Sequence, residues 1–195
     1  MSMLESLPKS NIDGILYDAE VVHSVLPQKA PFAFVDEILS LDAENMEIVA
    51  KWHLTGEEGF LKGHFPGNPV LPGVIQIESM AQAATLLTMI GREAETTGKR
   101  PAFMGVENCR FRAPVIPKAE IVLKAKLIMA RHGIYKYSGE LLTVDAEGKA
   151  LRKIVKLGVQ TKDDVQIIEG LEGDETIIVE GQSKMNDGDK VLIVE

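Results

Sequence analysis

The run from Val74 to Ile90 constrains the fold most strongly, because apolar residues occupy nearly every side of the helix it would form. A helix on a protein surface shows one apolar stripe and one polar face, so this pattern predicts a helix that is buried on most sides. Pro72 suits the first turn of such a helix, and Gly91 suits its C-terminal end. The rest of the chain must therefore cover most of this helix.

The other segments are predicted to include a run of antiparallel strands. Residues 45–54 alternate apolar and polar side chains, which is the period of a strand with one buried face. Prolines and glycines separate further strand-like runs at 32–41, 102–111, 120–129, 134–143 and 150–159. One buried helix combined with a series of such strands is typical of the α+β class.

Residues 161–195 have a different character from the rest of the chain. Short apolar runs at 165–168, 176–179 and 190–194 are separated by glycine-containing turns. We therefore expect two parts, a main domain over residues 1–160 and a small β-rich C-terminal appendage over residues 161–195.

Charge and composition exclude several classes of function. Lys and Arg number 21 against 29 Asp and Glu, so the net charge is −8, and aromatic residues make up only 5%. An acidic chain with few aromatic residues is a poor binder of nucleic acid. We expect neither a secretory signal nor a membrane-spanning segment. The single cysteine, Cys109, excludes an internal disulfide and fits a cytoplasmic location.

Two polar residues stand out beside the predicted helix. His64 lies in a loop rich in glycine and proline, and Glu78 lies within the apolar helix with Gln82 one turn later. A carboxylate there is costly unless it is paired or protonated, and burial favours the neutral acid. A neutral acid near an imidazole is a general acid–base pair. The N–H of Gly73 lies at the helix start, where it suits the binding of a developing oxyanion.

Residues 63–82 read Gly-His-Phe-Pro-Gly-Asn-Pro-Val-Leu-Pro-Gly-Val-Ile-Gln-Ile-Glu-Ser-Met-Ala-Gln. This block resembles the (3R)-hydroxyacyl-[acyl carrier protein] dehydratase family, which has the hotdog fold. Residues 26–32, 35–36 and 103–115 share the resemblance, which extends over roughly residues 20–160. It implies an antiparallel sheet wrapped around one long central helix, a homodimer or trimer of dimers, and neither metal nor organic cofactor.

The resemblance also implies roles for three residues. His64 matches the catalytic histidine of the family, Glu78 matches its catalytic glutamate (78 − 64 = 14 residues later), and Gly73 matches the glycine whose N–H polarises the thioester carbonyl. The histidine and the glutamate of one site come from different subunits. The implied reaction converts a 3-hydroxyacyl thioester of fatty-acid or lipid biosynthesis to a trans-2-enoyl thioester and water.

Further residues are expected to bind the acyl chain or the carrier. The substrate-binding candidates are Phe34, Phe65, Pro72, Met80, Gln82, Phe103 and Met104. The basic residues Arg110, Arg112 and Lys118 suit either an ordinary solvated surface or the docking of an acidic acyl carrier protein that carries a phosphopantetheine-linked acyl chain.

The sequence departs from the family at Gln28, Lys29 and Ala30, where Leu-Pro-Gln-Lys-Ala-Pro replaces Leu-Pro-His-Arg-Tyr-Pro. This departure bears on chain-length preference and on gating of the acyl tunnel. Two other uses of the fold stay open, a hotdog thioesterase and a non-catalytic acyl-binding or scaffold module. Residues 165–191 resemble the C-terminal strands of periplasmic efflux adaptor subunits, and we interpret them as an appendage for assembly and not as a sign of transport.

Overall fold

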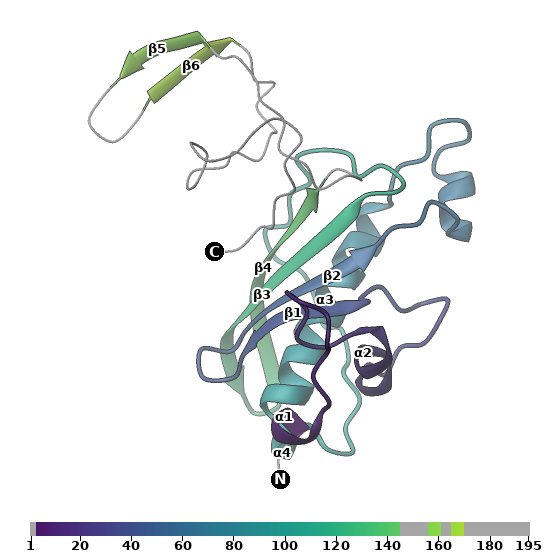
Figure 1. Cartoon of the computed structure of the whole chain (residues 1–195), viewed down its shortest axis with the longest axis vertical. Helices are drawn as coiled ribbons and strands as arrows, with labels where there is room; N and C mark the ends of the chain where they lie inside the picture. Colours follow the sequence, from purple (N-terminus) through teal and green to yellow (C-terminus); the bar gives the residue numbers. More distant parts are fainter. Residues whose placement is uncertain (1–2, 145–155, 161–164, 170–195) are drawn as a thin grey trace. The chain divides into compact units, whose positions relative to one another are not determined.

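A four-stranded antiparallel sheet packed against one long helix forms the main part of the molecule (Figure 1). The structure, a computed structural model, describes residues 3–144, 156–160 and 165–169. These residues group into two units. The first contains residues 3–110 and 114–144, and the second contains residues 111–113, 156–160 and 165–169.

Helix α3, Gly73–Gly91, is the predicted buried helix. It begins directly after Pro72 and ends at Gly91, as the sequence indicates. The buried residues of this helix are Ser79, Gln82, Ala83, Ala84, Leu86, Leu87, Thr88 and Ile90. The apolar ring is buried mainly in the second half of the helix, whereas Val74 in the first turn is 72% exposed and Ile77 is only half-buried. Helix α3 contacts strands β2, β3 and β4.

The sheet has the order β1-β2-β3-β4, with strands β1 Glu37–Asp42, β2 Glu47–His53, β3 Glu120–Arg131 and β4 Ile134–Val144. Every neighbouring pair is antiparallel. Burial on β2 alternates as predicted, with Ile48, Ala50 and Trp52 buried. Their register partners on β3 are Ala125, Leu123 and Ile121, which are also buried. These two rows join α3 in one apolar core.

A glycine on β4 allows the helix to approach the sheet. A Cβ atom at Gly139 would lie 2.3 Å from Cε of Met80 and 2.6 Å from the backbone oxygen of Lys124. Both distances are shorter than any real Cβ contact, and the backbone oxygen cannot move without disturbing the β3–β4 ladder. Position 139 therefore has to be glycine for Met80 of α3 to rest on this strand.

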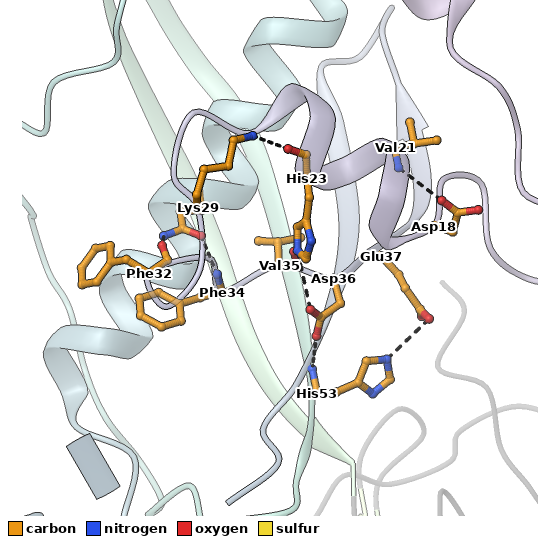
Figure 2. A network of polar contacts seen from close by, with 11 residues as sticks. Asp18, Val21, His23, Lys29, Phe32, Phe34, Val35, Asp36, Glu37 and His53 are labelled. Atoms are coloured by element: carbon orange, nitrogen blue, oxygen red, sulfur yellow. Dashed lines mark hydrogen bonds and ion pairs between the residues drawn. The ribbon is translucent and has the colours of Figure 1, made fainter. Parts of the chain in front are cut away.

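The remaining elements of the first unit are short. They are α1 Met3–Ser6, α2 Ala19–Val25, the 3-10 helix η1 Gly59–Gly63 and α4 Glu93–Thr96. The carboxylate of Asp18 caps α2 by accepting a hydrogen bond from the N–H of Val21 at 3.2 Å (Figure 2). The inner face of α2 buries Val21 and Val22 in the core.

Two strand predictions are wrong. Residues 102–111 form no strand, because no described residue supplies the hydrogen-bonding ladder that a strand needs. The strand predicted from Phe32 begins only at Glu37. The reason is that the N–H of Phe34 donates to the side chain of Gln82 at 2.7 Å, so this backbone is bonded to helix α3 and not to a neighbouring strand.

In the second unit, β5 Lys156–Gln160 and β6 Val165–Glu169 form an antiparallel pair. They confirm strand-like structure at 156–159 and 165–168. The predicted strand segments at 150–155, 176–179 and 190–194 lie outside the described residues. The boundary between the two units lies between residues 144 and 145. The expected domain boundary after residue 160 stays a prediction.

Candidate active site

His64 lies immediately after η1, at the start of a tightly bonded loop. Its N–H donates to the oxygen of Leu61 at 3.2 Å, and its own oxygen accepts from the N–H of Val70 at 2.7 Å. Between them, Phe65 and Asn68 exchange two backbone hydrogen bonds, of 3.3 and 3.0 Å. The backbone on both sides of the histidine is thus fixed, which holds the imidazole in a defined place.

The protonation pattern of the His64 ring follows from its hydrogen bond. Nδ1 lies 2.9 Å from the backbone oxygen of Val70, and a carbonyl oxygen can only accept. Nδ1 therefore carries a hydrogen, and the neutral ring has its lone pair on Nε2. The ring also stacks on Phe65, with ring centroids 4.4 Å apart and planes 25° apart. A half-buried imidazole with a free Nε2 is suited to accept a proton.

Glu78 lies in the second turn of α3 and is half-buried. Its Oε1 accepts hydrogen bonds from Nε2 of Gln82 at 2.9 Å and from Nε2 of Gln28 at 3.3 Å. The carboxylate is therefore paired, although with amides and not with a charge. Its Oε2 has no hydrogen-bond partner within the described part of the chain. A proton on this carboxyl group would accordingly sit on Oε2.

Gln82 connects this carboxylate to the loop before β1. Its side chain is fully buried, its Oε1 accepts from the N–H of Phe34, and its Nε2 donates to the oxygen of Phe32 at 3.0 Å. Because Oε1 is committed to an N–H donor, the amide cannot turn around, and Nε2 must face Glu78. Gln82 thus supports the polar stripe of α3.

Gly73 is the first residue of α3, where no intrahelical acceptor exists for its N–H. Among residues 3–144, no acceptor from elsewhere in the chain bonds to it either. The first turn also lacks an acidic side chain. This helix end therefore presents a free N–H and the positive end of the helix dipole, both of which favour a negatively charged oxygen.

No hydrogen bond joins His64 to Glu78 within the described residues of one chain. The histidine bonds to Val70, whereas the glutamate bonds to Gln28 and Gln82. Each residue thus has its own supporting contacts.

The predicted substrate-binding residues divide into two groups. Phe34 is buried, with its ring centroid 4.8 to 6.0 Å from those of Phe32, Trp52 and Phe60, and Met80 is half-buried against the core. Pro72 caps α3, and Gln82 makes the contacts described above. The exposed members are Phe65 at 59%, Phe103 at 58% and Met104 at 78%. The predicted docking residues Arg110, Arg112 and Lys118 are each exposed.

A second polar network fixes the loop between α2 and β1 and joins it to β2 (Figure 2). Nε2 of His23 donates to the oxygen of Val35 at 3.1 Å and lies 3.8 Å from Oδ1 of Asp36. Oδ2 of Asp36 accepts from the N–H of His53 at 2.8 Å, and Nζ of Lys29 donates to the oxygen of His23. These contacts hold the backbone of this loop in place.

Gln28 is the functional candidate that sequence reasoning missed. In the sequence it stands out only as a departure from the family motif, whereas in the structure its amide contacts Glu78. The described residues contain no cluster of three or more His, Cys, Asp or Glu that could hold a metal ion. None of the described helices combines the length and the hydrophobicity that a membrane-spanning helix requires.

Comparisons with known proteins identify families for two parts of the chain. Residues 26–150 match the FabA-like domain family, and residues 137–184 match the RND MFPs, C-terminal permuted SH3 domain family. The second match confirms the resemblance of the tail to efflux adaptor subunits.

Several curated relatives are named 3-hydroxyacyl-[acyl-carrier-protein] dehydratase FabZ. The protein from Erythrobacter litoralis is 41% identical over 124 residues, which cover 64% of this chain and 82% of that protein. The protein from Polynucleobacter necessarius is 38% identical over 148 residues, which cover 76% and 96%. A chain of the dehydratase heterocomplex ApeI:P from Xenorhabdus doucetiae is 18% identical with a TM-score of 0.50, covering 64% of this chain and 82% of that chain.

Proposed function

Since this chain belongs to the FabA-like family of hotdog dehydratases, we propose that it removes water from a (3R)-3-hydroxyacyl thioester linked to an acyl carrier protein. The product is the trans-2-enoyl thioester of fatty-acid or lipid biosynthesis. The observation that carries this proposal is the hydrogen bond from Nδ1 of His64 to Val70, because it leaves Nε2 as a base. The proposed setting is the cytoplasm, for which the lone Cys109 is the support.

In the proposed mechanism, Nε2 of His64 removes a proton from C2 of the substrate. The electron pair moves toward the thioester carbonyl, whose developing negative charge the N–H of Gly73 stabilises. The C3–O bond then breaks while Oε2 of Glu78 gives its proton to the departing hydroxyl, which leaves as water. His64 ends protonated and Glu78 ends as a carboxylate, and one proton transfer from the first to the second restores the starting state.

An absorbance assay tests the reaction directly. The C=C bond of the enoyl thioester is conjugated with the carbonyl and absorbs in the ultraviolet, whereas the 3-hydroxyacyl thioester has no such conjugated bond. We expect His64→Ala and Glu78→Gln each to lower kcat by about 100-fold or more, the usual contribution of a general acid or base. His132→Asn is the matched control, since His132 is exposed and its positive φ of 51° suits asparagine. Full activity in both site variants would refute the assigned roles, and release of free thiol would indicate a thioesterase instead.

We further propose that one active site takes His64 from one subunit and Glu78 from another. The support is that these residues have separate contacts within one chain. Mixing the two inactive variants under conditions of subunit exchange should then restore activity to about one quarter of the wild-type value, because half of the dimers are mixed and each has one intact site. If the mixture stays inactive although mass spectrometry shows mixed dimers, both residues serve the same chain's site.

The exposed residues Arg110, Arg112 and Lys118 are proposed to attract the acidic carrier protein. Replacing each with glutamate should lower kcat/KM for a carrier-linked substrate and leave kcat/KM for a pantetheine-linked substrate unchanged. An equal effect on both substrates would argue against docking. Added salt should weaken the carrier-linked reaction selectively, because exposed charges are screened.

A further inference from the structure

The amide of Gln28 makes one hydrogen bond through its nitrogen, while its oxygen is buried without a partner among the described residues. Its Nε2 donates to Oε1 of Glu78 at 3.3 Å, across 50 positions of sequence. Its own Oε1 is buried and has no hydrogen-bond partner within the described residues. A buried acceptor without a donor costs about 1 to 3 kcal/mol of stability. The side chain is therefore a poor choice for stability alone.

The orientation of this amide follows from Glu78. If the amide were reversed, its oxygen would face the oxygen of a carboxylate, and two acceptors would oppose each other. With Nε2 toward Glu78, the oxygen is left without a donor. One oxygen of Gln28 is thus left without a donor so that its N–H can donate to the carboxylate of Glu78. Such a local cost is expected at functional positions.

The donor acts on the oxygen that does not transfer the proton. Oε1 of Glu78 receives N–H groups from both Gln28 and Gln82, whereas Oε2 is free to face a substrate. As Glu78 gives up its proton, negative charge develops on both carboxylate oxygens. Two N–H donors already aimed at Oε1 stabilise that charge without any reorganisation.

We propose that Gln28 is a positioning residue that acts through Glu78. It holds Oε1 together with Gln82, keeps the transferable proton on Oε2, and stabilises the carboxylate that forms when the hydroxyl departs. A histidine ring at position 28 could supply a single N–H donor in the same way. The inference rests on the dehydratase function proposed above.

A series of substitutions at position 28 separates this role from packing. Gln28→Met keeps the length and removes the donor. We expect kcat to fall about tenfold with KM nearly unchanged, because in this proposal the residue acts through Glu78 and not on the substrate. Gln28→Glu offers only an acceptor and should be worse than Gln28→Met. Gln28→His restores a donor and should recover most of the loss. Lys29→Met is the matched control in the same loop. Nζ of Lys29 donates to the backbone oxygen of Leu26 at 2.7 Å, and no hydrogen bond joins Lys29 to Glu78 within the described residues.

Thermal stability gives the second readout. Gln28→Met removes the unsatisfied oxygen, so its melting temperature should equal or exceed that of the wild-type protein while its kcat is lower. A residue needed only for folding would lose stability and activity together. Equal kcat in the wild-type, Met and Glu proteins, or a decrease that follows the melting temperature across the series, would overturn the inference. The proposed function itself fails only if the wild-type protein shows no dehydratase activity.

Discussion

Replacing the buried Gln82 with methionine should destabilise the protein by about 3 kcal/mol, because it removes three hydrogen bonds with little change in volume. The buried N–H of Phe34 loses its acceptor, which costs about 1 to 3 kcal/mol. The bonds to Phe32 and Glu78 are partly accessible and contribute about 0.5 to 1.5 kcal/mol each. Methionine has nearly the same length as glutamine, so a packing defect adds little.

Urea unfolding at one fixed protein concentration measures this loss, since the stability of an oligomer depends on concentration. With a slope of about 2 kcal/mol per molar urea, the midpoint should fall by about 1.5 M. Gln76→Met is the matched control on the same helix, because Gln76 makes one hydrogen bond, to Leu71 at 3.1 Å. If both variants shift the midpoint equally, then Gln82 does not fasten the loop to the helix as described.

Other substitutions and pH changes test separate features. Gly139→Ala should lower the melting temperature through overpacking of about 1 to 3 kcal/mol, whereas Gly59→Ala, with nothing within 4 Å of the added atom, should have little effect. Burial raises the pKa of Tyr137 above its ordinary 10.0, so the associated stability is complete below pH 10.0 and is lost as pH rises through the folded-state value. Urea unfolding of Tyr137→Phe should therefore show a shallower alkaline loss than wild type. Hydrogen bonds from the backbone and side chain of Asn45 lower the pKa of Asp42 below 3.8, so stability should fall as pH drops below that value. The same titration on Asp42→Asn should be flatter, and identical acid curves would contradict this reasoning.

Sequence patterns predict those elements in which the spacing of apolar residues alone shows which side is buried. The period of residues 74–90 predicted α3, and the alternation around Trp52 predicted β2, because each pattern records one element's own exposure. The strand prediction for residues 102–111 is wrong because a strand also needs a partner backbone, which its own sequence does not specify. The late start of β1 has a similar cause, a side chain 48 positions away that bonds to Phe34.

The candidate site was only partly predictable for the same physical reason. His64, Gly73 and Glu78 lie in one continuous block whose spacing is visible in the sequence. Gln28 lies 50 positions before Glu78, and one sequence gives no measure of contact between such distant positions. Its contact with Glu78 therefore emerged only from the folded arrangement of the loop and helix.

The bond between His64 and Val70 has a consequence for how fast the imidazole can cycle. A protonated ring carries hydrogens on both nitrogens, so Nδ1 continues to donate to the same carbonyl whether Nε2 is empty or loaded. In the proposed mechanism, the ring can therefore accept and release a proton without rotating and without breaking its hydrogen bond to Val70. Because the loop's hydrogen bonds hold the ring in one orientation, each proposed proton transfer requires no change of side-chain conformation.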